Sequence, residues 1–351
     1  MESDLSDLFP APFPDNVPTI ELPKISLNKL LNEDPGELEK IFKICTRTGF
    51  FYLNMMDHPK GKKMYEDACL CCRIGMETLP NLPMEEKNKY PIRDRHGVFD
   101  RGFRCRYLRD DGQPKYSEFV NIPQTELFAK EPVDFKLPPW LEAHEETFKS
   151  AMRSANVVAN IVLGALERAL QLPSGTLTSL HRLNDPSSDF LRVLRYPGVV
   201  PGQTMDQMGF PAHKDAVSVA ILFTWLGGLQ IPEPGLEVTE ENWRWVKPMP
   251  GYAILNLGDA MEIFTNGVLK SGLHRVIKAP GEQAPFDKYS VLLVARPADP
   301  TPMTAFSSPL IPALTEEQKQ APVLTSDRWA SKAIRSLQDP AKAREMASMK
   351  Q

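Results

Sequence analysis

The sequence predicts a mainly β fold with flanking helices, in which a barrel or jelly roll rests on one long helix. Two observations predict it. Seven short β-rich runs, separated by turns and without a helical pattern between them, fall within residues 190–297. One long helical pattern, from Trp140 to Leu172, precedes them. Strands that follow one another without intervening helices are typical of barrels and jelly rolls rather than of parallel βαβ sheets.

The first 139 residues predict a module of helices, loops and short strands. A helix is expected from Pro35, because a proline and an acidic residue suit its first turn and Gly49 suits its end. It leads into the candidate strand FFYLNMM, and KKMYEDACLCCRIGMETL then predicts a second helix that ends before Pro80. Residues 91–139 are rich in charge, glycine and proline, so we expect loops and edge strands there.

The pattern from Trp140 to Leu172 is the clearest helix of the chain. Its apolar residues at positions 141, 148, 152, 155, 158, 162, 165 and 169 form one face. After the β-rich runs, TEEQKQ and DRWASKAIRSL predict a helical tail that borders the mouth of an active site. We therefore expect a single domain over 1–351, made of an N-terminal module (1–139), a spine helix and connection (140–183), a β core (184–300) and a C-terminal helical tail (301–351).

Composition and charge exclude several classes of protein. Apolar residues make up 42% of the chain, which is enough for a sizeable core. The net charge of -4 arises from interspersed charges, so neither a nucleic-acid partner nor a membrane partner is expected. The acidic, proline-broken N-terminus does not resemble a signal peptide, and we expect a cytoplasmic protein of unknown oligomeric state. The crowded Cys69, Cys71 and Cys72 fit buried, reduced helix thiols better than a metal clip.

Three residues are candidate metal ligands. His213 and Asp215 lie in PAHKDAV at the expected start of a strand, where alternate side chains share a face. His274, 59 positions after Asp215, begins another β-rich run. Two imidazoles and one carboxylate leave one side of a metal open, as a non-heme Fe(II) site requires, although zinc accepts the same ligands. The remaining histidines, His58, His96, His144 and His181, are expected in loops or at helix surfaces without a ligand role, and Asp259 is expected to be structural.

The order of several motifs resembles a known family. LRVLRYP, HKD, GGLQI, WVKPMPGYAILNLGD, FTNGVLKSGLHRV and KYSVLLVARP follow one another as in the isopenicillin N synthase-like Fe(II)/2-oxoglutarate-dependent dioxygenases. The N-terminal segments PTIELP, RTGFFYLNMMDH, LPMEEKNKY and RGF resemble the same family. This resemblance implies a distorted double-stranded β-helix that holds Fe(II) through His213, Asp215 and His274, with 2-oxoglutarate as cosubstrate and O₂ as oxidant.

The resemblance also implies a site for the distal carboxylate of 2-oxoglutarate. The family has R-x-S on the strand after the second histidine, where this chain has Lys288, Tyr289 and Ser290. On a strand, Lys288 and Ser290 share a face. A lysine supplies the charge of an arginine but not its planar two-point fork. We expect Lys288 and Ser290 to bind this carboxylate. The alternatives for Lys288 are that it binds an acidic group of the substrate or that it is an ordinary lysine at the surface.

The strand LRVLRYP contributes further site residues by the same resemblance. Tyr196 is expected to help hold 2-oxoglutarate, and Arg192 to meet the substrate, whereas Leu194 stands where the family often has asparagine. Phe103 and Phe119 are expected to line the substrate cavity, with aromatic core filling as the alternative for each.

The predicted protein is thus an oxidoreductase of specialised (secondary) metabolism that oxidises a small organic molecule by hydroxylation, desaturation or ring formation, releasing succinate and CO₂. Three other functions compete with it. An oxidase of the same fold, such as isopenicillin N synthase, needs no 2-oxoglutarate. A non-catalytic receptor for a small acid needs no metal ligands, and a zinc hydrolase needs a general base that the sequence does not show.

Overall fold

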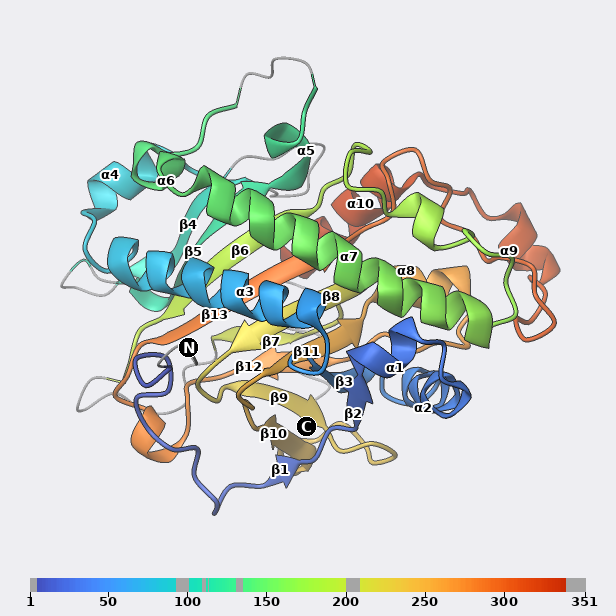
Figure 1. Cartoon of the computed structure of the whole chain (residues 1–351), viewed down its shortest axis with the longest axis horizontal. Helices are drawn as coiled ribbons and strands as arrows, with labels where there is room; N and C mark the ends of the chain where they lie inside the picture. The colour runs from blue at the N-terminus through green and yellow to red at the C-terminus, as the bar shows by residue number, and fades with distance from the viewer. Residues whose placement is uncertain are drawn as a thin grey trace.

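The computed structural model describes residues 5–92, 101–108, 112, 114–130, 135–199 and 209–338. Within these residues the core of the fold consists of two sheets, one of eight strands and one of five. Strand pairs are antiparallel except β1 with β10 and β2 with β3. Helices lie across one face of the eight-stranded sheet (Figure 1). No helix of the described residues is long and apolar enough to cross a membrane.

The eight-stranded sheet combines strands from both halves of the chain. Its order is β2 (Lys24–Ser26), β3 (Phe50–Asn54), β11 (Tyr252–Leu257), β8 (Val219–Thr224), β13 (Lys288–Ala295), β6 (Phe190–Tyr196), β5 (Pro114–Pro123) and β4 (Gly102–Leu108). The expected N-terminal module therefore supplies both ends of this sheet. The region 91–139, in which we expected loops and edge strands, contains the ten-residue strand β5 as well as the edge strand β4.

The five-stranded sheet has shorter strands, and three of them contribute residues to the lining of the cavity described below. Its order is β1 (Thr19–Ile20), β10 (Trp243–Val246), β9 (Leu229–Pro232), β12 (His274–Val276) and β7 (Phe210–His213). The strands β7 and β12 pair with a register shift between His274 and Val276.

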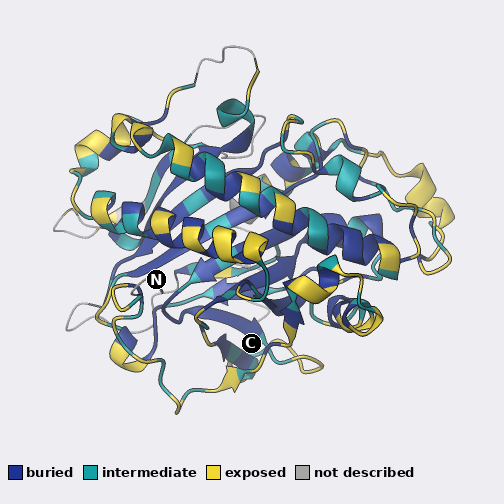
Figure 2. Ribbon diagram, in the orientation of Figure 1, coloured by how far each residue is buried: buried dark blue, intermediate teal, exposed yellow. Residues whose placement is uncertain are grey.

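Two long helices cover the eight-stranded sheet. The helices α3 (Pro59–Thr78) and α7 (Glu145–Ala169) lie side by side across it, with exposed residues facing outward and buried residues facing the sheet (Figure 2). The other helices are α1 (Leu27–Leu31), α2 (Pro35–Cys45), α4 (Met84–Asn88), α5 (Gln124–Leu127), α6 (Pro139–Glu142), α8 (Asp259–Phe264), α9 (Glu316–Gln320) and α10 (Ser326–Gln338). Short 3-10 turns occur at Thr178–Leu180, Glu240–Asn242 and Gly281–Gln283.

Alternation in the two central strands creates the cavity wall. In β6 and β13, odd-numbered residues such as Val193 and Val291 pack into the main core. Even-numbered residues point the other way, because successive side chains of a strand alternate between its faces. That second face of β6 and β13 lines a cavity. The phase expected for Arg192, Tyr196, Lys288 and Ser290 is therefore confirmed.

Three expectations about local structure were wrong. The helix expected from Trp140 to Leu172 is divided into α6 and α7 at Ala143 and His144. Its apolar face continues across the break, since Leu141 and Phe148 are both buried, so periodicity alone gives no sign of it. The helix α8 also interrupts the β-rich runs. Finally, β7 ends at His213 and β8 starts at Val219, so that Asp215 lies in the connection rather than on a strand.

Candidate active site

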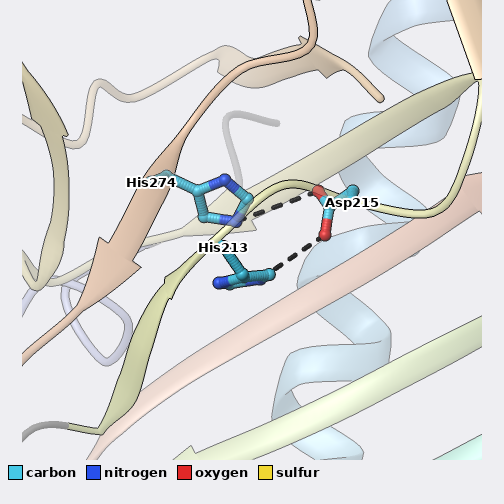
Figure 3. Close-up of side chains that lie close together, drawn as sticks. All are labelled: His213, Asp215 and His274. Carbon is cyan, nitrogen blue, oxygen red and sulfur yellow. Dashed lines mark ion pairs between the residues drawn. The ribbon is translucent and has the colours of Figure 1, made fainter. Parts of the chain in front are cut away.

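His213, Asp215 and His274 converge at one point. His213 is the last residue of β7 and is the direct partner of His274 across the β7–β12 ladder. Asp215 follows two residues later, where the chain turns toward β8. One ligand atom from each residue lies within 4.8 Å of the other two. The Nε2 atoms of His213 and His274 lie 3.5 and 3.8 Å from the two carboxylate oxygens of Asp215 (Figure 3).

Backbone carbonyls orient both imidazole rings. Nδ1 of His213 lies 2.9 Å from the carbonyl oxygen of Pro211, and Nδ1 of His274 lies 3.1 Å from that of Gly272. A carbonyl oxygen only accepts hydrogen bonds, so each Nδ1 carries a proton, and each Nε2 is the ring nitrogen that faces Asp215. This donor set fits a divalent metal ion.

The Asp215 carboxylate is held in its charged form. Burial acts to raise its pKa, but the two imidazoles and a hydrogen bond from Asn256 outweigh burial and place the pKa well below its usual range. The Asn256 amide donates to Oδ2 of Asp215 over 2.9 Å. Burial, reinforced by the neighbouring His213, lowers the pKa of His274 to about 4. At neutral pH the site therefore offers a carboxylate and a neutral His274, the protonation states that a metal requires.

The three residues open onto a cavity of about 790 Å³. The opposite wall is formed by the eight-stranded sheet, and Ile334 of α10 contributes to the lining, in agreement with a helical tail at the mouth. Predicted site residues on this wall are Phe119, Arg192, Tyr196, Lys288 and Ser290.

Lys288 is a buried cation in this wall. It is 4% exposed, and its Nζ atom lies 4.5 Å from the centre of the Tyr196 ring. No acidic side chain among the described residues forms an ion pair with it. Burial lowers the pKa of Lys288 to about 7. Ser290 lies on the same face, and its hydroxyl donates to Thr224 Oγ1 over 3.1 Å. A cation and a hydroxyl thus share one part of the cavity.

Arg192 lies further along the wall. Its Nε atom donates to Asn121 Oδ1 over 2.6 Å. Its guanidinium carbon lies 4.3 Å from the centre of the Phe119 ring and 4.6 Å from that of Phe190. Burial lowers the pKa of Arg192 to about 10.

Phe103 is the one predicted site residue that the structure places elsewhere. It is 2% exposed in the main core, where Lys87 Nζ lies 5.3 Å from its ring centre. Its neighbour Arg104 lines the cavity instead. The expected role was wrong because the strand β4 has the opposite phase, so that core filling, the stated alternative, applies to Phe103.

Several cavity residues were not predicted. Arg296 follows Lys288 and Ser290 at even spacing, a signal that was present in the sequence. Its guanidinium donates to the backbone carbonyls of Ala216 and Ser188. Asn256 is a single amide within the apolar run YAILNL, and such an isolated polar residue in a buried strand signals a hydrogen-bond partner. Phe190 gave no comparable signal, and neither did Asn121, which is the hydrogen-bond partner of Arg192 rather than a lining residue.

The remaining histidines and cysteines lie outside the triad. His58 and His144 are N-terminal caps of α3 and α7. His181, expected in a loop or at a helix end, is the C-cap of the 3-10 turn Thr178–Leu180. It is buried, with its ring nitrogens hydrogen-bonded to Ser218 Oγ and to the carbonyl of Leu177. His96 lies outside the described residues. Cys69, Cys71 and Cys72 are free and buried, as expected.

Comparison with known proteins decides the family. Residues 188–297 match the family model described as the 2OG-Fe(II) oxygenase superfamily. A 2-oxoglutarate-dependent dioxygenase of Aspergillus fumigatus is 49% identical over 97% of this chain and 92% of its own length. The chain belongs to the Fe(II)/2-oxoglutarate-dependent dioxygenases.

Other relatives agree with this assignment. Codeine O-demethylase of Papaver somniferum is 31% identical over 73% of this chain and 67% of its own length. The crystal structure of a full-length Neurospora crassa protein, in complex with α-KG and 5-formyluracil, matches with a TM-score of 0.68 at 20% identity, covering 89% of this chain and 95% of that one. The predicted fold and the predicted enzyme class are confirmed, and this dioxygenase uses Fe(II), 2-oxoglutarate and O₂. The hydrolase, receptor and 2-oxoglutarate-independent interpretations are set aside.

Proposed function

We propose that this dioxygenase oxidises a small organic molecule of specialised metabolism, by hydroxylation, desaturation or ring formation, while 2-oxoglutarate is converted to succinate and CO₂. The observation that carries the proposal is one cavity with the His213, Asp215 and His274 triad on one side and Lys288 with Ser290 on the other. Relatives whose names give codeine and thebaine as their substrates favour a small organic substrate.

The triad has the role of metal site in this proposal. The lone pairs of two Nε2 atoms and one Asp215 oxygen hold Fe(II), and the Asn256 amide keeps the carboxylate turned toward them. Fe(II) bound there supplies the redox chemistry that activates O₂ together with 2-oxoglutarate. Because the triad supplies only three ligand atoms, it would leave room for the cosubstrate and O₂ to bind beside it.

Lys288 and Ser290 have the role of holding the distal carboxylate of 2-oxoglutarate. The Lys288 ammonium provides the charge, and the Ser290 hydroxyl turns from Thr224 to donate a directed hydrogen bond to the carboxylate. Tyr196 packs its ring against the ammonium and limits where the lysine stem can lie. Because the ammonium is buried and forms no ion pair with a carboxylate of the described residues, a bound carboxylate offsets its desolvation. The apolar residues Leu292 and Val294, behind Ser290, exclude water from this end.

The experiment is an assay of succinate formation from 2-oxoglutarate with Fe(II) and O₂, before a substrate is known. Slow succinate formation without substrate is expected, and Asp215→Ala should abolish it together with Fe(II) binding. Asp15→Ala, at an exposed position, is the control and should behave as the unchanged protein. Absence of 2-oxoglutarate binding to the metal-loaded protein, or full activity of Asp215→Ala, would contradict the proposal.

A further inference from the structure

Two cations face the cavity from neighbouring strands. Lys288 of β13 pairs directly with Tyr196 of β6, and Leu292 of β13 pairs with Arg192 of β6. The two cations are therefore four residues apart along the ladder. At a rise of about 3.3 Å per residue this spacing corresponds to roughly 13 Å between their backbone positions. In the proposed function the distal carboxylate of 2-oxoglutarate pairs with Lys288, and the Asp215 carboxylate, whose charge reaches Arg192, is committed to the metal.

Arg192 has no acidic ion-pair partner in the described part of the chain. Its hydrogen bond goes to the neutral amide of Asn121. Arg195, three residues on and facing the other side of β6, differs: it contacts the carboxylates of both Glu118 and Asp287, at 2.8 and 2.6 Å. Carboxylates thus neutralise Arg195 on the core side of β6. Among the described residues, none forms an ion pair with Arg192 on the cavity side. Arg192 is partly buried, and a charge that is partly withdrawn from water without an ion pair is costly, which favours a ligand that pairs with it.

The guanidinium of Arg192 is also held in place. Asn121 fixes its Nε atom, and the rings of Phe119 and Phe190 lie against it at 4.3 and 4.6 Å. The two terminal nitrogens remain for a ligand in the cavity that they line. A guanidinium edge with two parallel N–H groups matches a carboxylate in two-point geometry. An arginine that is already ordered loses little conformational entropy when it binds.

The cavity that Arg192 faces is largely apolar. Phe119, Leu194, Leu292, Val217 and Ile334 belong to its lining. A ligand that fills this space therefore combines one anionic group with a hydrocarbon body.

We propose that Arg192 binds a carboxylate of the substrate, so that the molecule oxidised is an organic acid with an apolar body. This inference rests on the proposed function, in which Lys288 is already occupied by 2-oxoglutarate. It makes Arg192 the residue that selects acids over their neutral analogues.

The test is a calorimetric titration of the protein loaded with Mn(II) and 2-oxoglutarate. The probes are 4-phenylbutanoate and decanoate, each compared with its neutral amide. We expect the unchanged protein to bind at least one acid about tenfold or more tightly than its amide, the range of a charge-assisted hydrogen bond. In Arg192→Met this preference should vanish while the amide still binds. Arg192→Lys, which keeps the charge without the fork, should retain part of it.

Controls separate this inference from the proposed function. Arg168→Met makes the same exchange on α7 outside the cavity and should retain the full preference for acids. Titrations of Mn(II) and 2-oxoglutarate are done first, and failure of these overturns the proposed function. If they succeed, three outcomes overturn the inference: neither acid binds better than its amide, the preference survives in Arg192→Met, or Arg192→Met weakens 2-oxoglutarate binding as strongly as acid binding.

Discussion

The ammonium of Lys288 lies 4.5 Å from the centre of the Tyr196 ring, and the two residues are direct partners across the β13–β6 ladder. The ring face attracts the cation but does not neutralise it. Burial therefore dominates and lowers the pKa of Lys288 to about 7. The arginine that the family usually has at this place stays charged at any physiological pH. In the role proposed for Lys288, the exchange to lysine adds a proton equilibrium to the binding of 2-oxoglutarate.

The first prediction concerns the pH dependence of 2-oxoglutarate affinity. Below pH 7 the Lys288 amine is already protonated, so the affinity should be constant. Above pH 7 a proton must be taken up on binding, and the affinity should fall by up to about tenfold for each pH unit. Lys288→Arg should abolish this fall because the guanidinium remains charged. Calorimetric titrations of the Mn(II)-loaded protein at about pH 6.5, 7.5 and 8.5 measure it, and an equal slope in the variant would refute it.

The second prediction concerns Asn256 as a positioning residue. Its amide donates to Asp215 Oδ2 over 2.9 Å, so Asn256→Ala should allow the carboxylate to turn away from the two imidazoles. Loss of such a supporting contact typically weakens metal affinity about 10- to 100-fold. Titration with Fe(II) under anaerobic conditions measures this, without any need for turnover. Asn81→Ala, which removes an exposed amide bonded to the Glu77 carbonyl, is the control. Unchanged metal affinity in Asn256→Ala would show that the backbone alone orients Asp215.

Strand phase explains how far the sequence predicted this site. That Lys288 and Ser290 share a face could be predicted without knowing where the strand begins or ends, because the β13 run is long and apolar. In β4 the run is short and charged, so its phase was ambiguous, and Phe103 was placed on the wrong face. The interactions of Arg192 could not be predicted from the sequence, for another reason. Its partner Asn121 is 71 positions away in the chain, and the absence of an acidic ion-pair partner among the residues that the structure describes is a property of the fold.

The third prediction concerns a chain of buried charges on the core side of β6. Glu118 is completely buried and contacts Lys87 Nζ at 2.6 Å and Arg195 at 2.8 Å. Glu118→Gln leaves the buried Lys87 without a carboxylate and leaves Arg195 with Asp287 alone, which should lower the free energy of unfolding by about 3–5 kcal/mol. Urea denaturation measures the change. Glu39→Gln, in the exposed pair with Lys43, should have no measurable effect. Equal effects of the two variants would mean that the buried charges contribute no more than surface ones.

The last prediction compares two helical glycines. A Cβ atom at Gly75 of α3 would lie 2.3 Å from Cγ1 of Val193, whereas one at Gly164 of α7 would meet its nearest atoms at 3.7 Å. Gly75→Ala should therefore destabilise the protein by about 1–3 kcal/mol through overpacking. Gly164→Ala should stabilise it by up to about 1 kcal/mol, because alanine is the better helix former.

Opposite changes in the free energy of unfolding for Gly75→Ala and Gly164→Ala would test how closely α3 packs on β6. If the clash with Val193 is the cause, Val193→Ala combined with Gly75→Ala should recover part of the loss, since the new methyl group fills the space that the valine leaves. Urea denaturation of the four proteins of this cycle measures the coupling. Additive effects would mean that α3 moves away from the sheet instead.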